Sequence, residues 1–263
     1  IRVVLGSRGL GDVYKRQVYR RVMEATGASQ FWIPGIGLCD GIAAEYASSS
    51  RLIRFNHNFE NDILAAARNM AKRYKCHAGH NQTLEQYALS IFDATRKFHG
   101  MGARERLLLQ IAVTLHSCGK FISIRNSNES SYNLIMSTEI IGLSHLEREI
   151  IANVVRYNIR DFDYDMIQLE THIGEENTGD LNVGAITILI AKLTAILRLA
   201  NSMDKTHKAK MQDCRMAIRE GELVITTGYT GDLALERASF EQKADFFEEI
   251  FGIRPVLKQK RRV

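Results

Sequence analysis

The stretch LNVGAITILIAKLTAILRLA, residues 181–200, decides the fold. A helix drawn through it has almost no polar face, because its large apolar side chains point in nearly every direction. They are Ile186, Ile188, Leu189, Ile190, Leu193, Ile196, Leu197 and Leu199. A helix that is apolar all round is buried, so this segment predicts the central helix of a helical bundle.

Amphipathic helices precede this segment. Residues 59–74 place apolar side chains at the i, i+3, i+4, i+7 spacing of one helix face: Ile63, Leu64, Ala67, Met70, Ala71 and Tyr74. Similar patterns predict helices at 81–98, 104–117, 131–141 and 145–157. The fold class is therefore mainly α, with a helical bundle over residues 56–210.

The pattern changes after Arg219. Residues 223–227 (LVITT) are rich in β-branched side chains, and residues 233–240 alternate in part, so a glycine-containing loop between them predicts a β-hairpin. A helix is expected at 241–251. We interpret residues 215–263 as a small α+β subdomain that follows the bundle.

The first residues have a different origin. Residues 7–17 resemble the translation of a sequencing adapter, whose codons GAT GTG TAT AAG AGA CAG spell the DVYKRQ of residues 12–17. We expect residues 1–17 to be an artefact that replaces the natural upstream sequence. The rival interpretation of GSRGLG as a phosphate-binding loop lacks a preceding strand and a following GK[ST]. Residues 18–50 look like the end of a domain whose beginning is missing.

Charge and composition exclude several classes of protein. An apolar fraction of 45% and a charged fraction of 25% are typical of a globular chain. The net charge of +5 suggests a polyanionic partner, but without residues 1–17 Lys+Arg falls from 35 to 31 and Asp+Glu from 30 to 29, which leaves +2. The basic tail 258–262 accounts for that excess. No RNA-binding motif accompanies the tail, so we expect no specific nucleic-acid partner.

The four cysteines form no CxxC pair, which excludes a zinc ribbon and a thioredoxin-type motif. They indicate free thiols in a reducing cytoplasm. No apolar run approaches the roughly 20 residues of a membrane span, so we expect a cytoplasmic protein with no membrane partner.

The segment Leu115–Lys120 (LHSCGK) ends an apolar helix at a glycine, where a cavity can open. It resembles the HD-domain signature, in which a His-Asp pair binds a divalent metal with an earlier His and a later Asp. The resemblance assigns His80 as the first ligand and His116 as the His of the pair. Ser117 and Asn201 stand where the two aspartates are expected. Two neutral imidazoles hold a hard cation poorly, so this metal site is expected to be vestigial.

Longer strings resemble the exopolyphosphatase/guanosine pentaphosphate phosphohydrolase (Ppx/GppA) family over residues 18–262. They are FWIPG at 31–35, LCDGI at 38–42, SYNLI at 131–135, EIIGLS at 139–144, RYN at 156–158 and ANSMDKTH at 200–207. The family often has His where this chain has Ser130 and Asn158.

The resemblance implies an HD-like bundle within an enzyme that hydrolyses the phosphoanhydride bonds of inorganic polyphosphate, or of guanosine pentaphosphate (pppGpp). It also implies that catalytic carboxylates and Mg²⁺ belong to actin-like N-terminal domains, and that the protein is a homodimer. This chain is then expected to contain no catalytic residue, to bind no cofactor of its own and to be inactive alone.

Basic side chains near the former metal pocket are the candidates for contacts with a phosphate chain. They are Lys120, Arg125, Arg156, Arg160, Lys205, His207 and Lys208. Two alternatives stay open: a stand-alone metal-dependent HD phosphohydrolase, and a non-catalytic regulatory or dimerisation module. Residues 161–165 (DFDYD) resemble the start of a calcium loop, but Met166 and His172 stand where Gly and Glu are required.

Overall fold

The computed structural model describes residues 10–30, 35–50, 52–53, 58–165, 167, 169 and 183–259, without the side chains of 10–15 and 49. The chain divides into two compact units, residues 1–57 and 58–263. Residues 1–9 of the expected artefact, residues 31–34 of the FWIPG string and residues 260–263 of the tail lie outside the described residues. So do Met166 and His172, the two positions that argued against a calcium loop.

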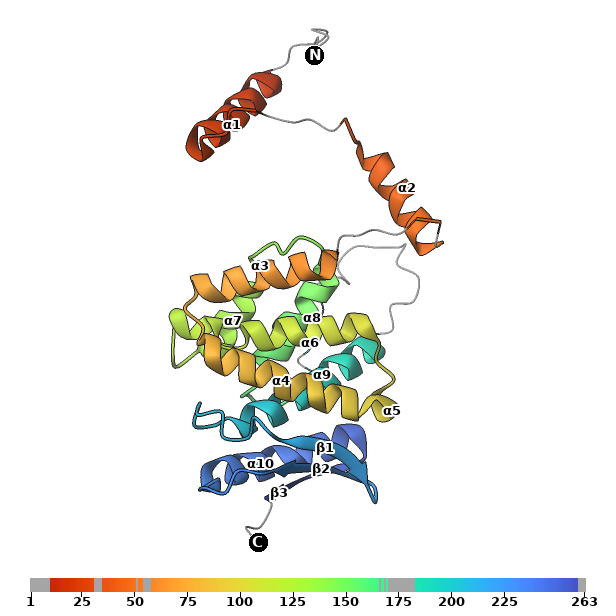
Figure 1. The fold of residues 1–263 in the computed structure, drawn as a ribbon, viewed down its shortest axis with the longest axis vertical. Helices are drawn as coiled ribbons and strands as arrows, with labels where there is room; N and C mark the ends of the chain where they lie inside the picture. Colours follow the sequence, from red (N-terminus) through yellow and green to blue (C-terminus); the bar gives the residue numbers. More distant parts are fainter. Residues whose placement is uncertain are drawn as a thin grey trace. The chain divides into compact units, whose positions relative to one another are not determined.

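The described residues of the first unit form two helices, α1 (Leu10–Thr26) and α2 (Leu38–Ser49) (Figure 1). Helix α1 runs without interruption across position 17, where we expected the artefact to end. Exposed apolar side chains lie along α2, including Leu38, Ile42 and Tyr46.

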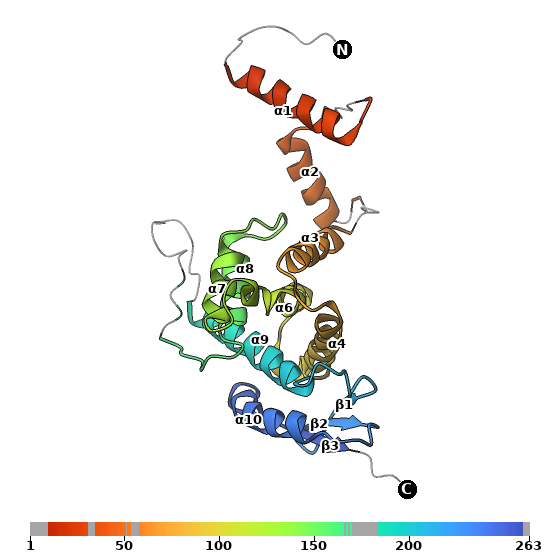
Figure 2. The same ribbon diagram turned by 90° about the vertical axis from the view of Figure 1, so that its left-hand side faces the viewer.

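The second unit begins with a bundle of helices (Figures 1 and 2). Its elements are α3 (Phe59–Arg73), α4 (Ala78–Ala94), α5 (Arg96–His99), α6 (Ala103–Leu115), the 3₁₀ turn η1 (Cys118–Phe121), α7 (Ser127–Met136), α8 (His145–Arg156) and α9 (Val183–Met203). The predicted central helix is α9, which packs against α4, α6 and α8. Ile190, Leu193 and Ile196 are fully buried on it. The mainly α fold class is confirmed.

Helix α9 also corrects the membrane analysis. It is 21 residues long with a mean hydropathy of 1.9 in its most apolar window, so by length and composition it is able to span a bilayer. Most of that window, 61%, is buried inside the protein, as expected for the core helix of a bundle.

The small α+β segment differs from its prediction. Strand β1 (Arg215–Arg219) pairs with β2 (Glu222–Thr227) in an antiparallel hairpin, and β3 (Arg254–Gln259) pairs with β2 in parallel. The predicted strand at 233–240 is wrong, because Ala234–Phe251 forms helix α10. Leu233, Glu236 and Phe240 are buried at spacings of three and four, which is the period of a helix rather than of a strand.

The real hairpin turns at Glu220 and Gly221, which both have a positive φ, of 51° and 79°. Two consecutive positive φ values are typical of the tight turns that join hairpin strands. Helix α10 packs along α9, so the sheet and the bundle share one compact unit. The buried Glu236 on α10 accepts hydrogen bonds from Thr206 and from Lys210, the latter at 3.0 Å.

Candidate functional site

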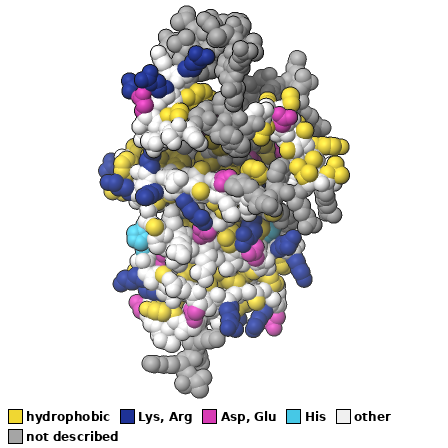
Figure 3. All heavy atoms as spheres, turned by 45° about the horizontal axis from the view of Figure 1, so that its top comes forward, with side chains coloured by type: hydrophobic (Ala, Val, Ile, Leu, Met, Phe, Trp, Pro, Cys, Tyr) yellow, Lys and Arg dark blue, Asp and Glu magenta, His cyan; other side chains and the backbone are white. Residues whose placement is uncertain are grey.

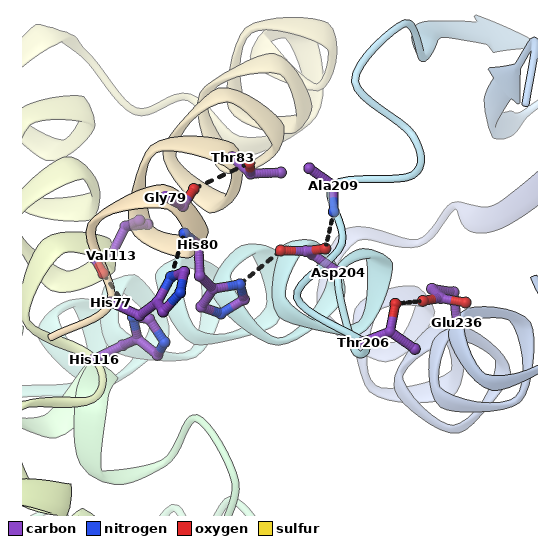
Figure 4. Close-up of polar contacts among 10 residues, drawn as sticks. All are labelled: His77, Gly79, His80, Thr83, Val113, His116, Asp204, Thr206, Ala209 and Glu236. Carbon is purple, nitrogen blue, oxygen red and sulfur yellow. Dashed lines mark hydrogen bonds and ion pairs between the residues drawn. The ribbon is translucent and has the colours of Figure 1, made fainter.

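Four histidines from three segments converge at one end of α4: His77, His80 and His116, which Figure 4 draws, and His207. His77 precedes α4 and caps it, because its Nδ1 accepts a hydrogen bond of 3.0 Å from the backbone N–H of His80. His116 ends α6, and His207 lies in the turn after α9. The two histidines that the sequence assigned as ligands, His80 and His116, are brought together, with ring centroids 5.4 Å apart.

The carboxylate at this site is Asp204. Its Oδ2 lies 2.7 Å from Nδ1 of His80, and its Oδ1 accepts a 2.8 Å hydrogen bond from the backbone N–H of Ala209. We expected the acidic position at 201, where this chain has Asn; the carboxylate that contacts His80 lies about one helical turn later. Burial raises the pKa of Asp204, but the hydrogen bonds from His80 and Ala209 outweigh burial and hold it below its usual value. Asp204 is therefore ionised.

The imidazole rings of His80 and His207 are stacked, with centroids 3.8 Å apart and planes 4° apart. Burial and the neighbouring His80 lower the pKa of His207. His116 is held in a different way, since its Nδ1 donates a 2.7 Å hydrogen bond to the carbonyl oxygen of Val113. Burial lowers the pKa of His116 to about 3, so this ring stays neutral at physiological pH.

The residues present do not fit a divalent metal. Among the described residues, no group of three or more His, Cys, Asp or Glu side chains is placed to hold a metal ion. Asp204 lies on the Nδ1 side of His80 and orients the ring, whereas the buried Nε2 on the other side has no hydrogen-bond partner in the described part of the chain. Ser117 supplies no anionic oxygen beside His116.

Two hollows meet at His77, His80 and His207, which line both of them. The first has a volume of about 480 Å³, and its wall includes Gln82, Gln86, Asp204, Lys208 and Gln212. The second has a volume of about 280 Å³, and its wall includes Tyr74, Lys75, Cys76, Lys120 and Phe121. Of the described residues that line the hollows, Asp204 alone carries a carboxylate.

The predicted cluster of cations divides in the structure. Lys120, His207 and Lys208 line the hollows, whereas Arg125 and Lys205 line neither. Sequence reasoning missed Lys75, which also lines the second hollow. Figure 3 shows Lys and Arg side chains at several separate places on the viewed face, with Asp and Glu among them.

Arg156 and Arg160 do not belong to this group. Both donate to the same oxygen of Glu129, at 2.8 and 2.9 Å, and the Arg156 guanidinium lies 5.0 Å from the ring of Tyr132. Their charges are thus partly neutralised by an acidic partner, and neither residue lines the hollows. Of the seven candidate cations, Lys120, His207 and Lys208 therefore line the hollows, and the four others do not.

Comparison with known families identifies the bundle. The family model Ppx/GppA phosphatase, domain III, matches residues 64–244. The chain belongs to the Ppx/GppA phosphatase family. The matched segment begins within α3 and ends within α10, so it includes every residue that lines the two hollows. A search of curated proteins finds no match.

Domain III of this Ppx/GppA chain also contains the two positions where the family resemblance led us to look for histidine. Ser130 is half-buried on α7. Asn158 is 2% exposed after the end of α8, and neither polar atom of its amide has a hydrogen-bond partner within the described ranges. Neither residue lines the hollows around His80.

Proposed function

We propose that the two hollows hold a chain of phosphate groups, and that this domain III contributes substrate binding to an exopolyphosphatase-type hydrolase. The substrate is inorganic polyphosphate, or pppGpp. The observation that carries the proposal is the charge of the walls. Lys75, Lys120 and Lys208 line two neighbouring hollows, and among the described lining residues the one carboxylate, on Asp204, is already bound to His80 and Ala209.

The arrangement suits an elongated anion. Lys120 belongs to the second hollow and Lys208 to the first, with the three shared histidines between them. Both lysines are exposed, so their ammonium groups are able to rotate onto successive phosphate oxygens. Ring nitrogens and the side-chain amides of Gln82 and Gln86 add neutral donors along the same path.

Chemistry at the bond that breaks is assigned to the actin-like half that the family resemblance implies. In the hollows, each carboxylate oxygen of Asp204 already accepts a hydrogen bond, from His80 and from Ala209, and we assign it as a positioning residue for His80 rather than a general base. Mg²⁺ would belong to that other half as well. We therefore propose that this chain alone binds phosphate chains without hydrolysing them, within a cytoplasmic homodimer.

The binding experiment uses tripolyphosphate titrated into the full chain in a calorimeter. Lys120→Gln and Lys208→Gln should each weaken binding about tenfold, the value of one charge-assisted hydrogen bond. Lys97→Gln, an exposed lysine on α5, is the matched control and should change nothing. Wild-type affinity should fall steeply with salt, because bound phosphates release counterions. Unchanged affinity in the double variant would contradict the proposal.

A phosphate-release assay with Mg²⁺ and long-chain polyphosphate separates this function from its alternatives. Turnover by this chain would contradict the assignment of catalysis to another half. Near-stoichiometric metal retained by the purified protein would favour the HD phosphohydrolase. Absence of polyanion binding in a protein that sediments as a dimer would favour the dimerisation module.

A further inference from the structure

The segment Lys120–Arg125 (KFISIR), which begins within η1 and continues past its end, exposes three large apolar side chains. Phe121 is 53% exposed, Ile122 60% and Ile124 86%. Exposed apolar side chains gathered in one short segment and flanked by basic residues mark an interaction surface more often than a neutral part of the exterior.

The backbone of this segment is fixed. The N–H groups of Ile122 and Ser123 both donate to the carbonyl oxygen of Gly119, each at 3.0 Å, and the N–H of Asn126 donates to Oγ of Ser123 at 3.1 Å. The N–H of Gly119 is bound in turn by Oγ of the buried Ser131, at 2.8 Å. The apolar side chains are therefore held outward by an ordered turn.

The two chain segments that form this part of the surface are basic. Phe121 contacts the end of α3, since its ring centroid lies 5.8 Å from that of Tyr74 and 5.8 Å from Nζ of Lys75. The sequence has no Asp or Glu at 72–80 or at 117–128. It has five exposed cations in these two segments, Lys72, Arg73, Lys75, Lys120 and Arg125.

We propose that this basic apolar tip, residues 72–75 with 120–125, docks on an anionic lipid surface, with Ile122 and Ile124 among the head groups and the cations against the lipid phosphates. This would be peripheral binding, in which apolar insertion and charge act together. It departs from our expectation of no membrane partner.

Two other occupants fit the tip less well. Single-stranded nucleic acid uses aromatic rings as stacking platforms, and the two most exposed apolar side chains here, Ile122 and Ile124, are aliphatic. A second copy related by a two-fold axis would bring the same five cations of both chains together, because such an interface uses one patch twice. Charge therefore favours a lipid surface.

The test is co-sedimentation of the full chain with vesicles of phosphatidylcholine in which about a third of the lipid is phosphatidylglycerol. Binding is expected with these vesicles and not with phosphatidylcholine alone. Ile122→Ser and Ile124→Ser should each weaken binding about tenfold, the effect of withdrawing one large aliphatic side chain. Ile141→Ser is the matched control, since Ile141 is 90% exposed in the loop between α7 and α8. It should bind as the wild type does.

A second measurement reports insertion directly. Phe121→Trp, made with Trp32→Phe so that one indole remains, should show a blue shift in fluorescence when phosphatidylglycerol vesicles are added. Four results would overturn the proposal: no vesicle binding, equal binding to neutral vesicles, binding that the two serine variants leave unchanged, or the serine variants abolishing a dimer or nucleic-acid binding instead. Tripolyphosphate binding is measured on Ile122→Ser and Ile124→Ser, since neither residue lines the hollows, and its retention separates this surface from the proposed function.

Discussion

Gly119→Ala tests whether the turn that presents Lys120 depends on the close approach of α7. A Cβ at position 119 would lie 2.1 Å from the carbonyl oxygen of Ser127 and 2.4 Å from the backbone nitrogen of Ser131. Both atoms are backbone, so the start of α7 has to move by about 1 Å. Overpacking of this kind costs about 1–3 kcal/mol. Loss of the hydrogen bond from Gly119 to Ser131 adds about 1 kcal/mol.

Thermal unfolding followed by circular dichroism measures the result. A loss of about 3 kcal/mol should lower Tm by about 10 °C for a unit of this size. Gly79→Ala is the matched control: its Cβ would meet nothing closer than His77, at 3.5 Å, and it lies in the first turn of α4. That variant should gain up to about 1 kcal/mol from helix propensity. A Tm for Gly119→Ala at or above the wild-type value would refute the reasoning.

Three further variants test the core, a buried ion pair and a buried histidine. Ile196→Ala should destabilise the unit by about 2–5 kcal/mol in urea unfolding, whereas Ile188→Ala on the same helix, at a 53% exposed position, should stay within about 0.5 kcal/mol. Lys210→Met leaves the buried Glu236 without its ammonium partner and should cost about 3–5 kcal/mol, most of it regained by adding Glu236→Leu. The pKa of His116 is about 3 in the folded protein and 6.5 in the unfolded chain. Between these two pH values the unfolded chain binds a proton on His116 that the folded protein does not bind. The contribution of His116 to stability is therefore full above pH 6.5 and is lost as the pH falls. By pH 5 the loss is about 2 kcal/mol, and His116→Gln should show a correspondingly flatter pH profile.

The bundle was predictable because its signals are long and periodic. Apolar residues recur over several turns in α3 and α8, and α9 is apolar on nearly every side, so packing leaves those segments no alternative conformation. The β-hairpin was missed for the opposite reason. Strand β1 spans five residues, Arg215–Arg219, that alternate between half-buried and exposed without one fully buried side chain. In the sequence, the apolar residues of 233–240 alternate only in part, at Leu233 and Leu235 and again at Ala238 and Phe240. Over so short a window this pattern does not separate a strand from a helix, and packing of α10 on α9 selects the helix.

The site was predictable only in part, because its members are far apart in the chain. His80 and Asp204 are 124 positions apart, and no local pattern links them. The resemblance located both histidines, His80 and His116. It placed the carboxylate at position 201 rather than 204, because residues three apart lie on nearly the same face of a helix and spacing alone does not separate them. Lys75 was missed because it lies just beyond the end of α3, where periodicity carries no information.

The turn at 204–209 shows why local rules fail at this site. His207 and Ala209 have positive φ values of 54° and 50°, although neither is glycine, and such conformations are strained. Two hydrogen bonds hold the turn, from the N–H of His207 to the carbonyl oxygen of Asp204, at 3.0 Å, and from the N–H of Ala209 to its carboxylate. The same carboxylate binds His80, so the Asp204 side chain connects α4 to the turn, and both line the first hollow. In this turn His207 stacks on the ring of His80, and Lys208 lines the hollow. Glycine would relieve this strain, but at position 207 it would also remove the ring that stacks on His80.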